Sequence, residues 1–302
     1  MKLKLSVLLA AVAAVAALAI APSALGGPAP AGAKLSAAQG SGTASACRGA
    51  AKPARWHYVV WIWMENKGYK EIIGSASSPY VNALAAHCGL ATNYRAITYP
   101  SLPNYLAATS GSTHGVTDDA LPAAHRISGP SIFSQVGGWR SLQHSMPTNC
   151  DRSNAYPYMV KHDPAAYYTS IRTQCRRQDT PLARTPSFAA PFTFITPNMC
   201  EDSHDCTSRT GDAWLAQFIP KLLTSRQYAA GDTLLVLTFD SDDHHSGNHV
   251  ATVLVAPSIA RGTRSGTAYT HYSLLRTTEE LLGKPLLGRA ASAPSMRRGF
   301  GL

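Results

Sequence analysis

The chain has 302 residues, of which 45% are hydrophobic and 15% are charged. It is therefore long and apolar enough to bury a sizeable core, and this composition excludes an intrinsically disordered protein. The formal net charge is +10, and a basic balance attracts anions such as phosphorylated molecules or acidic lipid head groups. Lysine and arginine form no clustered run, so the sequence does not predict a nucleic-acid-binding face.

Residues 1–27 have the pattern of a secretory signal peptide. Lys2 and Lys4 precede an apolar run over residues 5–21, which small residues and a proline follow. We expect cleavage between Ala24 and Gly27. The run is short for an anchor helix, so we expect a secreted protein without stable membrane insertion. Removal of residues 1–26 leaves a net charge of +8.

The rest of the chain alternates between predicted strands and helices, after a flexible lead-in over 28–54 that is rich in Ala, Gly, Pro and Ser. The expected strands are 57–63, 90–97, 139–144, 192–196, 233–239 and 250–256, and the expected helices are 80–87, 101–110, 132–136, 212–223 and 271–282. This alternation predicts an α/β fold whose central, mostly parallel sheet is covered by helices on both faces. We expect the last two strands to form a hairpin.

Residues 146–190 are polar, interrupted by prolines and rich in Tyr and Arg. We interpret them as a lid inserted into a domain that spans about 55–290, with 291–302 as a C-terminal tail. Six cysteines in an exported chain favour disulfides over thiol chemistry or zinc. Proximity along the chain suggests Cys150–Cys175, which would hold the lid, and Cys200–Cys206. The remaining pair is then Cys47–Cys88.

Polar groups follow the predicted strands at the points where they end. These groups are Glu65-Asn66, the run Asp240-Ser241-Asp242-Asp243 and the cluster over 198–205, and His271 starts the last helix. Each group has a simpler explanation as a helix cap, a solvated turn or a structural histidine. An α/β fold would nevertheless gather them at one edge of the sheet. Carboxylate, amide and hydroxyl oxygens there suit a divalent metal ion.

Ser101 lies at the start of the predicted helix 101–110, framed by Pro100 and Pro103. It is explained most simply as an ordinary helix-capping serine. The same place, at the positive end of the helix dipole, binds phosphate well and can make a serine nucleophilic.

Six segments appear in one order and together carry a resemblance. They are 64–66 (MEN), 99–106 (YPSLPNYL), 197–205 (PNMCEDSHD), 211–215 (GDAWL), 238–240 (TFD) and 270–275 (THYSLL). In this respect the chain resembles the secreted bacterial phosphoesterases that include acid phosphatases and non-specific phospholipases C, within the alkaline phosphatase superfamily. The resemblance covers about residues 56–288 and implies an alkaline phosphatase-like three-layer sandwich.

The resemblance also implies roles for individual residues. Ser101 would be the nucleophile, His204 and His271 would contact the phosphate or serve the leaving group, and Asn104, Asp202 and Asp205 would bind substrate. Glu65, Asn66, Asp240 and the Ser101 oxygen would hold a divalent metal ion of unknown identity. The family usually has Glu where this chain has Ser241, and often His where it has Tyr99; Asp242, or else Asp243, would supply the missing carboxylate.

We therefore expect a secreted, metal-dependent phosphatase that hydrolyses small phosphomonoesters through a phosphoserine intermediate. A phospholipase C-type phosphodiesterase that acts on a lipid head group is the nearest alternative. A second alternative, which Ser241 favours, is an inactive anion-binding module. A serine esterase is disfavoured because the chain has no GxSxG elbow.

Overall fold

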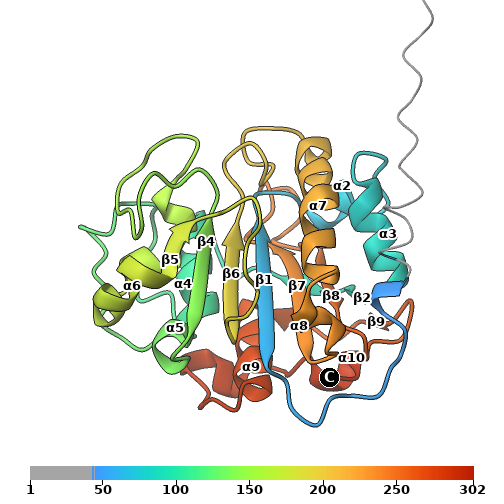
Figure 1. Cartoon of the computed structure of the whole chain (residues 1–302). Coiled ribbons are helices and arrows are strands. Elements are labelled where there is room, and N and C mark those ends of the chain that lie inside the picture. The colour runs from blue at the N-terminus through green and yellow to red at the C-terminus, as the bar shows by residue number, and fades with distance from the viewer. Residues whose placement is uncertain (1–42, 44) are drawn as a thin grey trace, which may run out of the picture. The chain divides into compact units, whose positions relative to one another are not determined.

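The computed structural model describes Thr43 and residues 45–302, coloured in Figure 1. The expected signal peptide, and the expected lead-in as far as residue 42 together with residue 44, lie outside the described residues. None of the described helices is both long enough and apolar enough to cross a lipid bilayer.

The centre of the fold is an eight-stranded sheet with the order β5-β4-β6-β1-β7-β8-β2-β9. All neighbouring pairs are parallel except those of β8, which runs against both β7 and β2. The hairpin prediction for β7 and β8 is thus confirmed. The strands of this sheet are β1 (Tyr58–Met64), β2 (Gly89–Ala91), β4 (Trp139–Gln143), β5 (Asp179–Pro181), β6 (Phe192–Thr196), β7 (Thr233–Phe239), β8 (Thr252–Val255) and β9 (Arg264–Ser265).

Helices cover both faces of the sheet, as predicted for an α/β fold. Packing joins α4 to α9 on one face and α3 to α7 on the other, and α7 crosses in front of the sheet in Figure 1. The α-helices are α2 (Tyr69–Ile72), α3 (Pro79–His87), α4 (Ser101–Ser110), α5 (Ile132–Gln135), α6 (Arg172–Gln178), α7 (Ser208–Leu223), α8 (Arg226–Ala229), α9 (His271–Leu281) and α10 (Arg297–Phe300). The 3-10 helices are η1 (Val160–His162), η2 (Pro164–Tyr167), η3 (Thr169–Ile171) and η4 (Gly288–Ser292).

The single strand expected over 90–97 is wrong. The chain forms two short strands there: β2 in the main sheet, and β3 (Tyr94–Arg95), which pairs with β10 (Tyr269–Thr270) in a separate two-stranded sheet. The break falls at Thr92 and Asn93. Their backbone groups bond to residues 265 and 269, Thr92 through its N–H and Asn93 through its carbonyl. The strand breaks because these backbone groups form hydrogen bonds with residues that are far away in the chain. The local apolar pattern does not show such partners.

The segment 146–190 does more than cover the core. It supplies β5, which extends the sheet beyond β4, and it buries Tyr158, Tyr167 and Tyr168 completely or almost so. Cys150–Cys175 holds it, and Cys47–Cys88 and Cys200–Cys206 are the other two disulfides, so all three suggested pairings are confirmed.

The register of β1 against β7 decides where the polar groups meet. Met64, the last residue of β1, pairs with Phe239, the last residue of β7. Both strands are buried along almost their whole length, because helices cover the two faces. The first residues after these strands, Glu65 and Asp240, therefore leave the sheet side by side.

Candidate active site

Three buried carboxylates meet at the carboxyl edge of the sheet. Glu65 follows β1, Asp240 follows β7, and Asp202 lies in the loop after β6. Backbone hydrogen bonds join them, because Glu65 N donates to the Asp202 carbonyl at 2.9 Å and Asp240 N donates to the Met64 carbonyl at 3.0 Å. The Glu65, Asp202 and Asp240 residues are 0% exposed. The sequence predicted this gathering, and the parallel register is its physical cause.

Ser101 joins the carboxylates from α4. It is the first residue of that helix, and its Oγ donates a hydrogen bond to Glu65 Oε2 at 3.0 Å. The residue before the helix is Pro100, which offers no capping side chain. Asp119 Oδ1 instead accepts from Leu102 N at 2.9 Å. The Ser101 hydroxyl is thus free of a capping role and is aimed at the carboxylate edge, near the positive end of the α4 dipole.

The Asn66 side chain lies among the same carboxylates. One terminal atom of its amide is 3.1 Å from Glu65 Oε2, 3.1 Å from Asp240 Oδ1 and 3.2 Å from Ser241 Oγ. Nitrogen in this place would donate to both carboxylates, whereas oxygen there would share a cation with them. The Asn66 backbone has φ 43°, a left-handed conformation that asparagine tolerates better than most residues.

The electrostatics of this edge favour a bound cation. Burial raises the pKa of Glu65 well above its ordinary range, and the charges of Asp240 and Asp202 raise it further. Burial also raises the pKa of both aspartates. Uncompensated buried carboxylates are costly unless they are paired or bind a metal. Oxygens from Glu65, Asn66, Asp240 and Ser101 are the donor set that a hard divalent ion prefers, so these residues fit the expected metal.

A second group of metal-type donors does not form a metal site. Cys150, Cys175 and Asp179 lie close together. The two sulfur atoms are bonded to each other in a disulfide, and metal binding to cysteine requires a thiolate.

Sequence reasoning missed His162 of η1. Its ring is buried and lies between two of the carboxylates, with Nε2 3.3 Å from Glu65 Oε1 and Nδ1 3.4 Å from Asp202 Oδ2. It stacks on the Tyr105 ring, whose hydroxyl donates to Glu65. Burial lowers the pKa of His162 well below its ordinary value, and the charge of Lys161 lowers it further. A neutral His162 can donate a proton from only one of its two nitrogens.

Lys161, also missed, brings a positive charge to the same edge. It forms an ion pair with Asp119 at 3.1 Å. Burial opposes its charge, but Glu65, Asp119 and Asp240 together raise its pKa. The only signal in the sequence was the ionisable run 161–163 inside the expected lid. This run does not follow a predicted strand, so nothing in the sequence indicated that it lies beside the other candidate residues.

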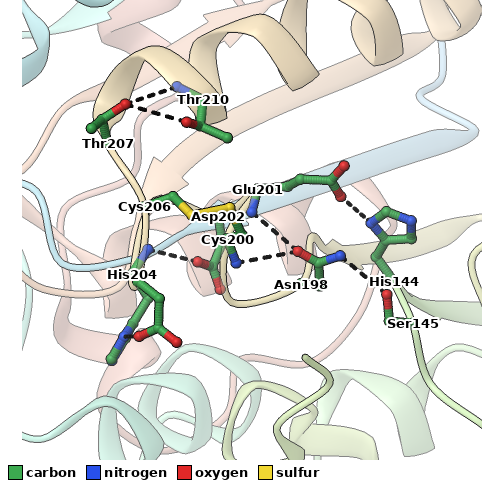
Figure 2. The surroundings of a disulfide bond; sticks show 11 residues. His144, Ser145, Asn198, Cys200, Glu201, Asp202, His204, Cys206, Thr207 and Thr210 are labelled. Atoms are coloured by element: carbon green, nitrogen blue, oxygen red, sulfur yellow. Dashed lines mark hydrogen bonds and ion pairs between the residues drawn. A yellow bond between two sulfur atoms is a disulfide. The ribbon is translucent and has the colours of Figure 1, made fainter. Parts of the chain in front are cut away.

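His204 and Asp205 lie at the outer side of the site, in the loop that Cys200–Cys206 closes (Figure 2). His204 N donates to Asp202 Oδ1 at 2.7 Å, and its Nδ1 lies 2.8 Å from Asp205 Oδ1. The His204 side chain is 24% exposed, and its ring is 5.9 Å from that of His162. The structure thus places His204 within reach of both the buried carboxylates and solvent. Asp205 orients the His204 ring.

His271, predicted to contact the phosphate or serve the leaving group, is 0% exposed and both of its nitrogens are engaged. Nε2 is 2.7 Å from the Asp240 carbonyl oxygen and Nδ1 is 3.0 Å from the Tyr94 hydroxyl. Burial lowers its pKa to about 4, so the ring is neutral near pH 7 and donates to Asp240. In this structure His271 positions the backbone that carries Asp240.

Asn104, predicted to bind substrate, uses its whole amide to fix the turn before α4. Its Oδ1 accepts from Ile97 N at 2.9 Å and Thr98 N at 3.1 Å, and its Nδ2 donates to the carbonyls of Thr98 at 2.7 Å and Pro100 at 3.2 Å. These four bonds hold the backbone that delivers Ser101.

Asp242, predicted as a metal ligand, has both carboxylate oxygens engaged in hydrogen bonds with other groups. It accepts from the backbone N–H groups of His244, Ser246 and Asn248 and from the Tyr99 hydroxyl. Burial opposes its ionisation, but these hydrogen bonds hold its pKa below the ordinary value. The residue beside the carboxylates is Ser241, whose Oγ lies 3.2 Å from the Asn66 amide and 3.3 Å from Asp240 Oδ2.

Comparison with known proteins shows the family to which this chain belongs. The sequence profile of the phosphoesterase family matches residues 61–284, which include every carboxylate described above. The chain belongs to the phosphoesterase family. It is 32% identical to an acid phosphatase of Aspergillus fumigatus over 254 residues, which are 76% of this chain and 55% of that protein. It is 30% identical to a phosphatidylinositol-3-phosphatase of Mycobacterium tuberculosis, covering 78% of this chain and 80% of that protein.

This member of the phosphoesterase family thus spans little more than half the length of the fungal relative. A solved structure from the alkaline phosphatase superfamily of Vibrio parahaemolyticus matches the fold with a TM-score of 0.57 at 12% identity. The match covers 87% of this chain and 79% of that one. The expected α/β sandwich of the alkaline phosphatase type is therefore confirmed.

Proposed function

We propose that this chain is a secreted, metal-dependent phosphomonoesterase that works through a phosphoserine intermediate at Ser101. One observation carries the proposal: Ser101 Oγ lies at the start of α4 and donates at 3.0 Å to Glu65, inside a cluster of buried carboxylates. A serine in this position has its hydroxyl directed by an acceptor, and the helix N–H groups favour an incoming anion.

The acid phosphatase relatives support phosphatase activity and small phosphorylated substrates. The mycobacterial relative is named for a phosphoinositide, which makes a phosphoinositide head group one substrate to assay.

Glu65, Asn66 and Asp240, with the Ser101 oxygen, would hold the cation. A bound divalent cation would supply Lewis-acid stabilisation of phosphoryl oxygens and of the serine oxygen. Other residues of the protein hold these metal-binding groups in position. Asn104 fixes the turn that presents Ser101, and His271 fixes the backbone of Asp240.

The proposed reaction has two steps, and side chains of this protein act in each of them. Ser101 Oγ attacks phosphorus, its proton passes to Glu65 Oε2, and the bond from phosphorus to the leaving oxygen breaks. His204, partly exposed beside the buried edge, would give that oxygen a proton. Water then attacks phosphorus and gives a proton to His204, the bond from phosphorus to Ser101 Oγ breaks, and Glu65 returns its proton to Oγ, which restores the Ser101 hydroxyl and releases inorganic phosphate. Lys161 and His162 lie where they can stabilise phosphoryl charge.

The surface favours a phosphomonoesterase over a phospholipase C-type enzyme. Among the described residues, the large hydrophobic side chains that are exposed are Leu121 at 41% and Tyr156 at 68%. An enzyme that works on a lipid surface presents a larger apolar face than these two side chains provide. Comparing phosphate release from a monoester with diacylglycerol release from phosphatidylcholine separates the two activities.

The test of the proposal is Ser101→Ala, assayed for phosphate release. We expect the loss of at least about 10³-fold in kcat, because the nucleophile is removed, with little change in thermal stability. Ser110→Ala, at the other end of α4, is the control and should retain activity. After a rapid quench in acid, wild type should carry phosphate on Ser101. Undiminished phosphate release by Ser101→Ala would overturn the nucleophile assignment, and the absence of release by wild type would overturn the phosphatase.

A further inference from the structure

The loop over residues 242–249 lies beside the nucleophile. The segments 99–101 and 240–242 run along each other, so that Ser101 lies near Asp240 while the Tyr99 hydroxyl donates to Asp242. Two residues span at most about 7 Å of extended chain. Tyr99 therefore lies at the border of the site, on the side where the loop begins at Asp242.

The Tyr99 ring is stacked under the imidazole of this loop. Its centroid is 3.8 Å from that of His244, and the two planes are inclined by 24°. Tyr99 is half-buried, whereas His244 is exposed. The pair therefore forms a stacked aromatic surface that is partly open to solvent and that begins two residues before Ser101 in the chain.

The loop is held in place at several points. Asp242 accepts hydrogen bonds from three backbone N–H groups of the loop, among them that of His244 at 2.9 Å. At the other end, the His249 ring stacks on Tyr69 with centroids 4.3 Å apart. The middle packs against Gly68 so closely that a Cβ there would lie 2.6 Å from Ser246 Oγ.

His244 itself adopts a backbone conformation that is costly for a residue with a Cβ. Its φ is 70°, in the left-handed region. A strained conformation persists only where the surroundings enforce it, and such residues gather at functional sites. Asn66 in the carboxylate cluster and Asn248, whose N–H donates to Asp242, also have positive φ.

We propose that the stacked rings of Tyr99 and His244 form the wall against which the leaving group of the substrate packs. The exposed face of His244 selects flat, ring-bearing leaving groups over small acyclic ones. Aromatic pairs gain from offset stacking beyond the burial of area, and a rigid surface binds without paying to order a loop. The inference rests on the proposed phosphatase activity, and it assigns the specificity of that site to a loop outside the carboxylate cluster.

The experiment compares phenyl phosphate with glycerol 2-phosphate in wild type and in His244→Ala. We expect kcat/KM for phenyl phosphate to fall about three- to tenfold, mainly through KM, which is the range that one aromatic contact supplies. The value for glycerol 2-phosphate should change less than about twofold. Inhibition constants for phenylphosphonate and methylphosphonate should show the same contrast, since these compounds report binding without chemistry.

Two further variants separate specificity from folding. His244→Phe keeps a ring and should restore the preference for phenyl phosphate. His245→Ala, the neighbouring exposed residue, should behave as wild type. If kcat/KM in His244→Ala falls equally for both substrates, or falls for neither, the proposal that the Tyr99 and His244 rings contact the leaving group is overturned. A wild-type enzyme that hydrolyses neither substrate would instead overturn the phosphatase proposal, so the two failures are distinguishable.

Discussion

Lys161 Nζ lies 3.1 Å from Asp119 Oδ2, while the other oxygen of that carboxylate accepts a hydrogen bond from Leu102 N at the start of α4. One carboxylate therefore joins the helix that presents Ser101 to an ammonium group whose charge lowers the pKa of Glu65. The Lys161 side chain is 14% exposed, so its charge is poorly screened. We infer that Lys161 is a phosphate-binding group held ready by Asp119.

Lys161→Met should weaken the binding of inorganic phosphate. A hydrogen bond to a charged group contributes about 1.5–3 kcal/mol, so the inhibition constant for phosphate should rise by at least about tenfold. Lys161→Arg keeps the charge and should recover part of the affinity. Lys221→Met, at an exposed position of α7, serves as the control. An unchanged inhibition constant in Lys161→Met would show that Lys161 has a structural role only.

Asn104→Asp tests whether this side chain fixes the turn or binds substrate. The change replaces an amide that donates to the carbonyls of Thr98 and Pro100 with an oxygen that repels them. We expect a loss of about 1–3 kcal/mol in the free energy of unfolding, the cost of unsatisfied buried groups. We also expect kcat to fall, with little change in KM. A variant of wild-type stability whose KM alone rises would favour direct substrate binding.

Asp240→Asn and Asp242→Asn should differ in divalent-cation binding. Asp240 faces Asn66 and Glu65, whereas the oxygens of Asp242 are used by the loop and by Tyr99. Calorimetric titration with divalent cations should show lost or greatly weakened binding in Asp240→Asn. Asp242→Asn should bind the cation and lose thermal stability. Loss of the cation site in Asp242→Asn, with the fold intact, would restore Asp242 as a ligand.

Glu279→Gln should remove a pH dependence of stability. Burial raises the pKa of Glu279 on α9 to about 8, although Leu287 N donates to it. The folded state thus retains a proton that the unfolded state loses above about pH 4.5, so stability falls as the pH rises from about 4.5 to about 8. Glutamine keeps the acceptor for Leu287 and can donate to Gln135, whose Oε1 has no partner in the described structure.

Chemical denaturation at pH 5 and pH 8.5 measures this effect. The variant should gain up to about 4 kcal/mol over wild type at the higher pH relative to the lower one, because about three pH units at about 1.4 kcal/mol each lie between pH 5 and the folded-state pKa. Glu280→Gln, which changes the neighbouring carboxylate that pairs with Arg276, is the control. Equal stability differences at both pH values would show that Glu279 is ionised in the folded protein.

The sequence by itself predicted most of the architecture. Long runs such as 57–63 and 233–239 can be buried only in the middle of a covered sheet, and their periodicity differs from that of the helices. The helix at Ser101 could be predicted to the residue, because Pro100 ends the preceding turn and Pro103 falls in the first turn of an Ala- and Leu-rich stretch. The polar residues at strand ends predicted where the carboxylates meet.

Only the tertiary structure decided which candidates touch. Asp240 and Asp242 are equivalent in the local sequence, yet one turns to Glu65 and the other to the loop that Tyr99 anchors. His162 reaches the site from a segment without a strand end. The physical reason is that sheet register fixes the backbone at strand ends, whereas side chains in loops follow whichever long-range hydrogen-bond partners the packed fold brings to them. Those partners are far apart in the chain, and no local pattern encodes them.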